Sequence, residues 1–315
     1  MTVSYGRFSA KVGTGVRLDR DEALRYLGYA GQQVDDALLA RFHALAQACE
    51  RDIEPTYAWS VFDVDAAASW FEIAGRERVS RSVEGAAVLD DGAALATASG
   101  VSAGAGEEDF VRDGEASPAG DVPCAGEAAA SFADVPALLD GGPCVALKGC
   151  ELVLSGSDIV RHLAGASKVA LMACTMGMEN EREYRRLAAV SPADGMMFGS
   201  CCSALVEAAA NAVEAQIAEA ASREGMVTNW RYSPGYGDLP LDVQPAFLDA
   251  LDATRRLGIN VTPTNMLVPV KSVTAVIGLF DNESAAFESR AGETCASCPA
   301  AGDCDFRKRG TTCHG

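Results

Sequence analysis

The spacing of apolar residues predicts two helices and a strand near the N-terminus. Between Asp19 and Glu54, the stretches DEALRYLGYAG and DDALLARFHALAQACERDI carry apolar side chains every three or four residues, and acidic residues stand at both starts. The run YAWSVFDV, residues 57 to 64, mixes aromatic and β-branched residues and is typical of a strand.

Regular patterns return after about residue 143. CELVLSG leads into a helix start at Ser157 and Asp158, and the later segments alternate irregularly between helical and strand patterns. The elements predicted there are a buried strand KVALMACT, an exposed helix ENEREYRRL, a long Ala-rich helix from about Asp194 to Arg223, a helix PAFLDALDATRRLGI that stops at Gly258, and a final strand SVTAVIGLF. This order favours the α+β class.

Composition divides the chain into four parts. Residues 84–142 are dominated by Ala, Gly, Asp, Glu and Ser, with few large apolar groups to offset the entropy of ordering, so we expect a flexible insertion there. The remaining parts are an N-terminal helix and strand region, 1–83, a core region, 143–286, and a Cys-rich tail, 287–315.

Charge and hydropathy narrow the range of partners. The formal net charge of −18 would repel phosphate backbones and anionic membranes, which argues against a nucleic-acid or membrane partner. No uninterrupted apolar run reaches the roughly 18 residues that span a bilayer, and the opening residues lack the apolar core of a secretion signal. We therefore expect a cytoplasmic protein.

RYSPGYGD, residues 231 to 238, is a candidate ligand-binding turn. Pro234 fixes one backbone dihedral and Gly235 permits a conformation closed to other residues, so that a ligand can approach the backbone closely. Arg231 offers a fork of donors that matches a carboxylate, and Tyr236 offers a flat face and a hydroxyl. A ligand that bears an amino acid would suit both, although such a spacing also occurs in ordinary surface turns.

The C-terminal half of the chain resembles the activation domain of cobalamin-dependent methionine synthase, which binds S-adenosylmethionine (AdoMet). The resemblance runs in order from SGSDIVRHLAGASKVALMACTMG through the Ala-rich helix, RYSPGYGDLPL and the helix ending RRLGI to VTPTNMLVPVKSVTAVIGLFDNE. It implies a stand-alone relative of that domain, with a mixed or antiparallel twisted sheet packed against long helices.

The resemblance also implies site residues. In the family an Arg-x-x-x-Gly-Tyr element cradles AdoMet, which places Arg231, Gly235 and Tyr236 at the ligand, with Pro234 inside the same element. The family further uses an acidic side chain of the long helix that precedes this loop. Here Glu207 and Glu214 share one helix face with Asn211 between them, and the sequence leaves the choice between the two glutamates, or a solvated face, open.

The implied function is reductive methylation of cob(II)alamin, which needs a positioned methyl donor more than an acid or base. The chain would then require a partner that carries the cobalamin, such as methionine synthase or a related corrinoid protein, and an electron donor. His162 does not replace that partner, because DIVRHLAG has two residues too many to match the Asp-x-His-x-x-Gly signature of corrinoid-binding modules. We interpret His162 as a helix residue.

Cysteines supply a second candidate site. Cys295, Cys298, Cys304 and Cys313 form a CxxC followed by two further cysteines, a set that could bind zinc or an iron–sulfur cluster, or remain without metal. The adjacent pair Cys201-Cys202 lies at the start of the Ala-rich helix, where small buried residues are the better interpretation than zinc ligands.

One alternative function stays open at this stage, and two others are disfavoured. The first is a regulatory subunit that binds AdoMet or docks a corrinoid protein without contributing to catalysis. The second is a small-molecule methyltransferase, which KVGTG does not support because no βαβ unit follows it. The third is a radical AdoMet enzyme, which would need a CxxxCxxC loop that these cysteines do not form.

Overall fold

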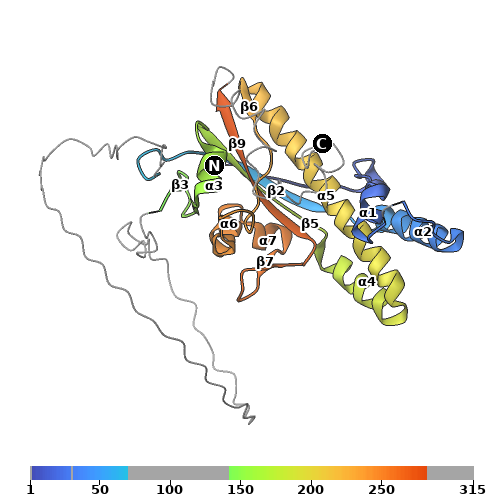
Figure 1. The fold of residues 1–315 in the computed structure, drawn as a ribbon. Helices are drawn as coiled ribbons and strands as arrows, with labels where there is room; N and C mark the ends of the chain where they lie inside the picture. Colours follow the sequence, from blue (N-terminus) through green and yellow to red (C-terminus); the bar gives the residue numbers. More distant parts are fainter. Residues whose placement is uncertain (1, 30, 70–141, 282–315) are drawn as a thin grey trace, which may run out of the picture. The chain divides into compact units, whose positions relative to one another are not determined.

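The computed structural model describes residues 2–29, 31–69 and 142–281 (Figure 1). These residues belong to one unit, Met1–Arg78 together with Gly141–Gly315, and a second unit, Val79–Asp140, lies outside the described residues. The predicted insertion, apart from Gly142, and the predicted Cys-rich tail therefore stay predictions.

A five-stranded sheet forms the centre of the described unit, in the order β1-β2-β5-β9-β6 (Figure 1). Its strands are β1 (Ser4–Arg7), β2 (Thr56–Asp63), β5 (Lys168–Thr175), β6 (Met226–Thr228) and β9 (Ser272–Asp281). All neighbouring strands are antiparallel, and β5 pairs along its whole length with β2 on one side and β9 on the other. Because both faces of β5 are covered, its residues from Val169 to Thr175 are all buried.

The long helix α5 (Pro192–Arg223) crosses one face of this sheet, with three further helices beside it (Figure 1). These are α1 (Arg20–Tyr26), α2 (Asp36–Asp52) and α4 (Gly177–Val190). The α5 helix starts at Pro192, where a missing amide costs nothing, and the Ser191 side chain caps its first turn by accepting from the Asp194 amide. Its buried side chains join the even-numbered residues of β5, such as Met172 and Cys174, in one core cluster.

Shorter elements cover the opposite face. They are the hairpin β3 (Cys144–Ala146) and β4 (Val153–Ser155), α3 (Ser157–Leu163), the 3₁₀ turn η2 (Leu241–Val243), α6 (Gln244–Ala250), α7 (Ala253–Leu257), and the hairpin β7 (Asn260–Val261) and β8 (Leu267–Val268). A second core cluster lies between them and the sheet, and includes Phe62 of β2, Leu171 of β5 and Phe247 of α6. The sheet therefore separates two apolar layers.

The predicted α+β class is confirmed, and the sheet is antiparallel. Both N-terminal helices, the strands at 57 to 64, 168 to 175 and 272 to 280, and the long helix lie where the sequence predicts them. One difference concerns PAFLDALDATRRLGI, which forms two helices instead of one because Asp252 adopts a left-handed conformation, with φ of 52°, between α6 and α7. The predicted stop at Gly258 follows directly after α7.

Among the described residues, α5 alone is long and apolar enough to cross a membrane by length and composition. Of its most apolar window, 61% is buried inside the fold, against the sheet and the neighbouring helices. The apolar composition of α5 is therefore accounted for by its place in the core.

Candidate functional site

The loop 231 to 238 is held against the edge of the sheet at one end and against α3 at the other. Tyr232 exchanges two backbone hydrogen bonds with Val276 of β9, of 2.9 and 2.8 Å. At the far end the Asp238 carboxylate accepts from the backbone amides of Ser157 and Asp158, at 2.5 and 2.9 Å. Two fixed ends determine the course of the turn between them.

The turn itself has the backbone that the sequence predicts. Gly235 has a φ of 93°, in the region that favours glycine, and its amide donates to the Leu239 carbonyl at 2.8 Å. Pro234 is buried, whereas the Tyr236 side chain is 69% exposed. The turn therefore exposes an aromatic ring to solvent, while hydrogen bonds to the rest of the fold fix its backbone.

The Arg231 side chain points away from the turn and toward α5, where it contacts three polar side chains. Its Nη2 donates to Asn211 Oδ1 at 2.7 Å and to Glu207 Oε2 at 3.3 Å, and its Nε lies 3.2 Å from Glu214 Oε2. Residues 207, 211 and 214 follow one another at helical spacing, so they line one face of α5. The structure thus brings together the arginine of the turn and both candidate glutamates.

Burial differs between the two glutamates. The Glu207 side chain is 44% exposed, against 27% for Glu214 and 19% for Arg231. Burial raises the pKa of the Glu214 carboxyl above its usual range, and the positive charge of Arg231 only partly opposes this. Arg231 Nη1 is buried and has no acceptor among the described residues. The cluster therefore has one cation for two carboxylates, within a partly desolvated environment.

The charges of this cluster also affect the pKa values of two further side chains. The pKa of the Cys174 thiol in β5 is raised to about 12 by complete burial, with the Arg231 charge acting in the opposite direction. The pKa of Tyr26 at the end of α1 is raised to about 12 by burial and by nearby carboxylates, Glu22 first and Glu207 among them. Cys174 of β5 and Tyr26 of α1 therefore lie close enough to the cluster for its charges to shift their pKa values.

Lys271 and Ser203 extend the polar face of α5 by one turn. Lys271 Nζ donates to Ser203 Oγ at 2.6 Å, and Ser203 precedes Glu207 by four residues. The Lys271 backbone is anchored at the start of β9, since its carbonyl accepts from the Met176 amide at 2.9 Å. Sequence reasoning missed this pair, because 68 residues separate its members and no motif joins them.

The other residues singled out in the sequence have structural roles or lie outside the described residues. His162 is a buried residue of α3, bonded to the Trp230 carbonyl at 3.0 Å and packed against the Trp230 and Tyr232 rings, which confirms the helix interpretation. Cys201 and Cys202 are buried, and Cys202 Sγ lies 3.6 Å from Cys49 Sγ. The four-cysteine set lies outside the described residues: Cys295, Cys298, Cys304 and Cys313.

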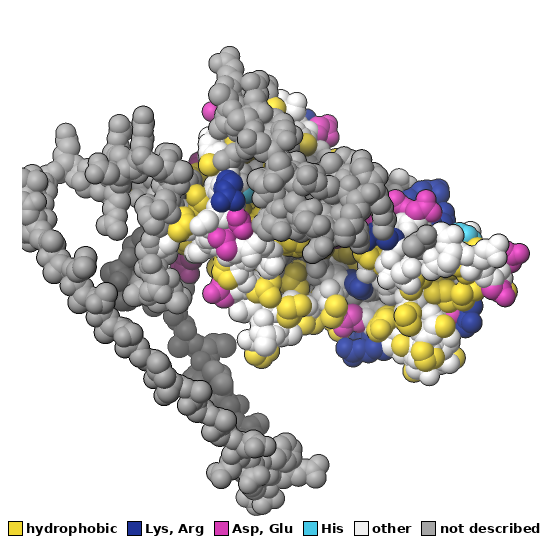
Figure 2. Space-filling view, viewed as in Figure 1, with side chains coloured by type: hydrophobic (Ala, Val, Ile, Leu, Met, Phe, Trp, Pro, Cys, Tyr) yellow, Lys and Arg dark blue, Asp and Glu magenta, His cyan; other side chains and the backbone are white. Residues whose placement is uncertain are grey.

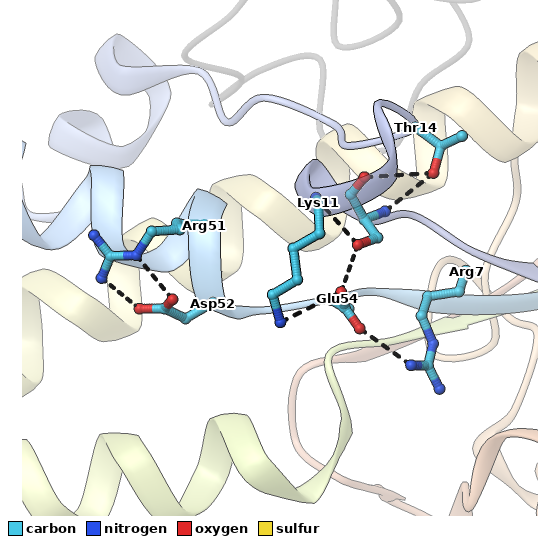
Figure 3. Close-up of polar contacts among 7 residues, drawn as sticks. Arg7, Lys11, Thr14, Arg51, Asp52 and Glu54 are labelled. Atoms are coloured by element: carbon cyan, nitrogen blue, oxygen red, sulfur yellow. Dashed lines mark hydrogen bonds and ion pairs between the residues drawn. The ribbon is translucent and has the colours of Figure 1, made fainter.

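A second charged cluster lies at the N-terminus (Figure 3). The Glu54 carboxylate accepts a short hydrogen bond from Ser9 Oγ, and it pairs with Arg7 Nη1 at 3.1 Å and Lys11 Nζ at 3.7 Å. The Arg7 and Lys11 side chains are 62% and 67% exposed. The pKa of Glu54 is lowered, chiefly by the Ser9 hydrogen bond. This cluster joins β1 and the adjoining 3₁₀ turn to the end of α2, and only its two cations lie largely in solvent.

Exposed hydrophobic side chains are visible toward the α4 end of the molecule (Figure 2). Among the exposed large apolar residues are Met178 at the start of α4, and Met266 and Val270 in the segment before β9. The Val270 amide donates to Glu181 of α4 at 2.5 Å, so the segment is tied to that helix. Val270 directly precedes Lys271 in the chain.

Comparison with known proteins supports the fold. No protein-family model and no characterised protein sequence matches the chain. The chain is similar to a solved structure entitled "Crystal Structure of the MetH Reactivation Domain bound to AdoHcy", with a TM-score of 0.50 and 12% sequence identity. The similarity covers 90% of this chain and 80% of that chain. The predicted resemblance to the methionine synthase activation domain is therefore confirmed at the level of fold.

Proposed function

We propose that this chain binds AdoMet between α5 and the loop 231 to 238, and supports reductive methylation of cob(II)alamin on a partner corrinoid protein such as methionine synthase. The observation that carries the proposal is the meeting of Arg231 with Glu207, Asn211 and Glu214. These residues come from the two segments that the family resemblance singles out. The structural neighbour was solved with AdoHcy, the molecule that AdoMet becomes after it gives up its methyl group.

The charges of the cluster suit such a ligand. Two carboxylates face one guanidinium, so the site has an excess negative charge that favours a ligand with a sulfonium and an ammonium group. Gly235 allows the ligand to approach the turn backbone, and the exposed Tyr236 ring offers a stacking face for adenine. Pro234 would keep the turn rigid beneath them.

Of the two glutamates, Glu207 is the one we assign to the ligand. Its side chain is 44% exposed, against 27% for Glu214, while the two carboxylates lie at similar distances from Arg231. Glu214 is more buried and would instead hold the Arg231 side chain in place. The assignment selects one of the alternatives that the sequence leaves open.

Positioning is the chemistry that these residues would supply. In reductive methylation one electron from a donor would first reduce cob(II)alamin, and the methyl group of AdoMet would then pass to cobalt as its bond to sulfur breaks and AdoHcy is released. No proton has to be moved in this reaction, so the cluster needs to fix the ligand's orientation and to leave the methyl group accessible. The cobalamin and the electron would come from partners.

The exposed apolar side chains suggest where a corrinoid partner would dock. Met178, Met266 and Val270 lie in the segments next to Lys271, so a partner there would face the ligand. The same observation favours a second candidate function, a docking or AdoMet-binding regulatory subunit that contributes nothing to catalysis. The acidic composition and the buried α5 fit a cytoplasmic protein in either case.

Calorimetric titration with AdoMet tests the binding proposal. We expect micromolar binding to the wild-type chain and loss of that binding in Arg231→Ala, with circular dichroism to verify that the variant folds. Recovery of methylcobalamin from cob(II)alamin, with a corrinoid methyltransferase and a chemical reductant present, then separates reactivation from docking. Binding without recovery would support the regulatory subunit, and absence of binding would overturn the proposal.

The tail cysteines stay a separate proposal within this function. An iron–sulfur cluster on Cys295, Cys298, Cys304 and Cys313 could pass the electron that reductive methylation consumes, whereas zinc would only hold the tail. Protein purified without oxygen would contain iron and sulfide in the first case. Absence of both, together with normal AdoMet binding by cysteine-to-serine variants, would remove the electron-transfer role.

A further inference from the structure

Lys271 is a partly buried cation that lies on the polar face of α5. Its Nζ donates to the Ser203 hydroxyl, and no carboxylate lies within 4 Å of it in the part of the chain that the structure describes. Lysine is rarely withdrawn from water without an acidic partner, and most strictly so where it is fully buried. Lys168, the other partly buried lysine among the described residues, pairs with Glu224 at 2.7 Å.

Arg231, by contrast, already has its own anionic partners. Its Nη2 and Nε face Glu207 and Glu214, so a ligand carboxylate bound at the remaining Nη1 would lie beside these negative charges. Repulsion between like charges makes that arrangement unfavourable. The sequence alone suggested Arg231 as the carboxylate receptor, and the structure makes Lys271 the better candidate.

We propose that Lys271 binds the carboxylate of the ligand's amino-acid portion, while Glu207 accepts hydrogen bonds from its ammonium group. This assignment rests on the proposed function. Ser203, which holds Lys271, and Glu207 are one helical turn apart, or about 6 Å along the axis. The carboxylate and ammonium groups of an amino acid are attached to the same carbon, so long side chains reaching from positions one turn apart can contact both.

The assignment defines the ligand class as a nucleoside that carries a free amino acid. AdoMet and AdoHcy both satisfy it. A nucleoside thioether without the amino acid, such as 5′-methylthioadenosine, has no group for Lys271 to bind and would depend only on the turn and the α5 acids. Lys271 would thus determine specificity for the amino-acid end.

The test compares the two kinds of nucleoside on three variants. Lys271→Met removes the charge and keeps the length of the side chain, Lys271→Arg keeps a cation, and Lys168→Met is the control at a paired lysine. Calorimetry would measure the dissociation constants for AdoHcy and 5′-methylthioadenosine. For Lys271→Met we expect a loss of about 10-fold to 100-fold for AdoHcy, the range of one hydrogen bond between charged groups, and no change for 5′-methylthioadenosine. Lys271→Arg should restore most of the affinity, and Lys168→Met should match the wild type.

The outcomes separate this assignment from the proposed function. If Lys271→Met weakens both nucleosides equally, the lysine has a structural role and the assignment is wrong. If the variant binds AdoHcy as tightly as the wild type, the assignment is also wrong, while AdoMet binding stands. If the wild-type chain binds neither nucleoside, the proposed function itself fails and takes the assignment with it.

Discussion

At the N-terminal cluster one carboxylate, Glu54, is surrounded by two cations, whereas at the α5 cluster one guanidinium, Arg231, is surrounded by two carboxylates. The pKa values of their acids shift in opposite directions. A hydrogen bond from Ser9 lowers the pKa of Glu54, while burial raises the pKa of Glu214. Both acids face an arginine, so the presence of a cation does not decide the direction.

The hydrogen bond from Ser9 and the burial of Glu214 account for the opposite pKa shifts, and the two clusters also differ in how exposed their cations are. The Arg7 and Lys11 side chains lie mostly in water and cost little to place, so the first cluster is a surface ion pair of small net energy. The Arg231 side chain is only 19% exposed, and Glu207 and Glu214 lose part of their hydration when they lie beside it, which costs free energy. A ligand that brings positive charge would relieve that cost, which is the physical reason to look for function at α5 and not at Glu54.

The largest expected effect is that of Arg231→Ala compared with Arg7→Ala. Removal of Arg231 leaves two carboxylates facing each other without a cation, so we expect a loss of about 2 kcal/mol in the free energy of unfolding at neutral pH. Arg7→Ala removes an exposed pair and should cause no measurable loss. Urea denaturation of both variants checks this. Equal losses would show that the two clusters do not differ as their exposure indicates.

Substitution of the loop glycines has the next largest effect. Gly235 and Gly13 both have a positive φ, of 93° and 76°, so alanine at either position should cost about 1 kcal/mol of unfolding free energy. A side chain at Gly13 would meet open space, whereas one at Gly235 would meet Leu241. We therefore expect Gly235→Ala to be the more destabilising, and only this variant to weaken AdoMet binding. Weaker binding by Gly13→Ala would contradict the location of the site.

Most of the core could be predicted from sequence because its signals are local. KVALMACT is a continuous apolar run, as a strand covered on both faces must be, and the long helix between Asp194 and Arg223 is free of proline. The edge strand Ser4–Arg7 was not predicted, because four residues with alternating exposure give little pattern. The break at Asp252 was missed because the apolar spacing continues across it while Arg255 and Arg256 satisfy its carboxylate.

The candidate site was predictable only in part. Arg231, Glu207 and Glu214 follow from the family resemblance, but their mutual contacts depend on β9 and α5 being packed together. Lys271 had no signal at all, since its relation to Ser203 is created by strand pairing and helix packing. Sequence patterns identify the segments of such a site, and tertiary packing decides which charges face each other.

The two clusters should also differ, by a smaller amount, in how they make the stability of the protein depend on pH. Because the folded-state pKa of Glu214 lies above its usual 4.5, its ionisation opposes folding: the stability associated with this group is complete below about pH 4.5 and is lost as pH rises through the raised pKa. Glu54 has a lowered pKa and gives the opposite sign, with stability present above about 4.5 and lost as pH falls through the lowered value.

Glutamine variants of the two acids test these opposite pH dependences of stability. Glu214→Gln keeps an acceptor for Arg231 without the charge, so it should be at least as stable as the wild type at pH 7, with the difference vanishing toward pH 4.5. Glu54→Gln should be less stable than the wild type at pH 7, with that difference shrinking at low pH. Thermal unfolding across this pH range checks both. If the stability differences of the two variants from the wild type changed with pH in the same direction, burial would not be what sets the pKa of Glu214.

The smallest expected effect on stability concerns two exposed tyrosines. Tyr236 of the loop and Tyr5 of β1 are 69% and 66% exposed, so neither contributes much to the core. Tyr5→Ala loses a contact in which the Arg256 guanidinium lies 4.8 Å from the ring centre, and Tyr236→Ala loses only a hydrated surface, so both changes should stay below about 1 kcal/mol. The two variants should differ in their affinity for AdoMet. If adenine stacks on Tyr236, Tyr236→Ala should bind about 10-fold more weakly, whereas Tyr5→Ala should bind as tightly as the wild type. Unchanged binding in both variants would remove the turn's aromatic ring from the site and leave recognition to the charges along α5.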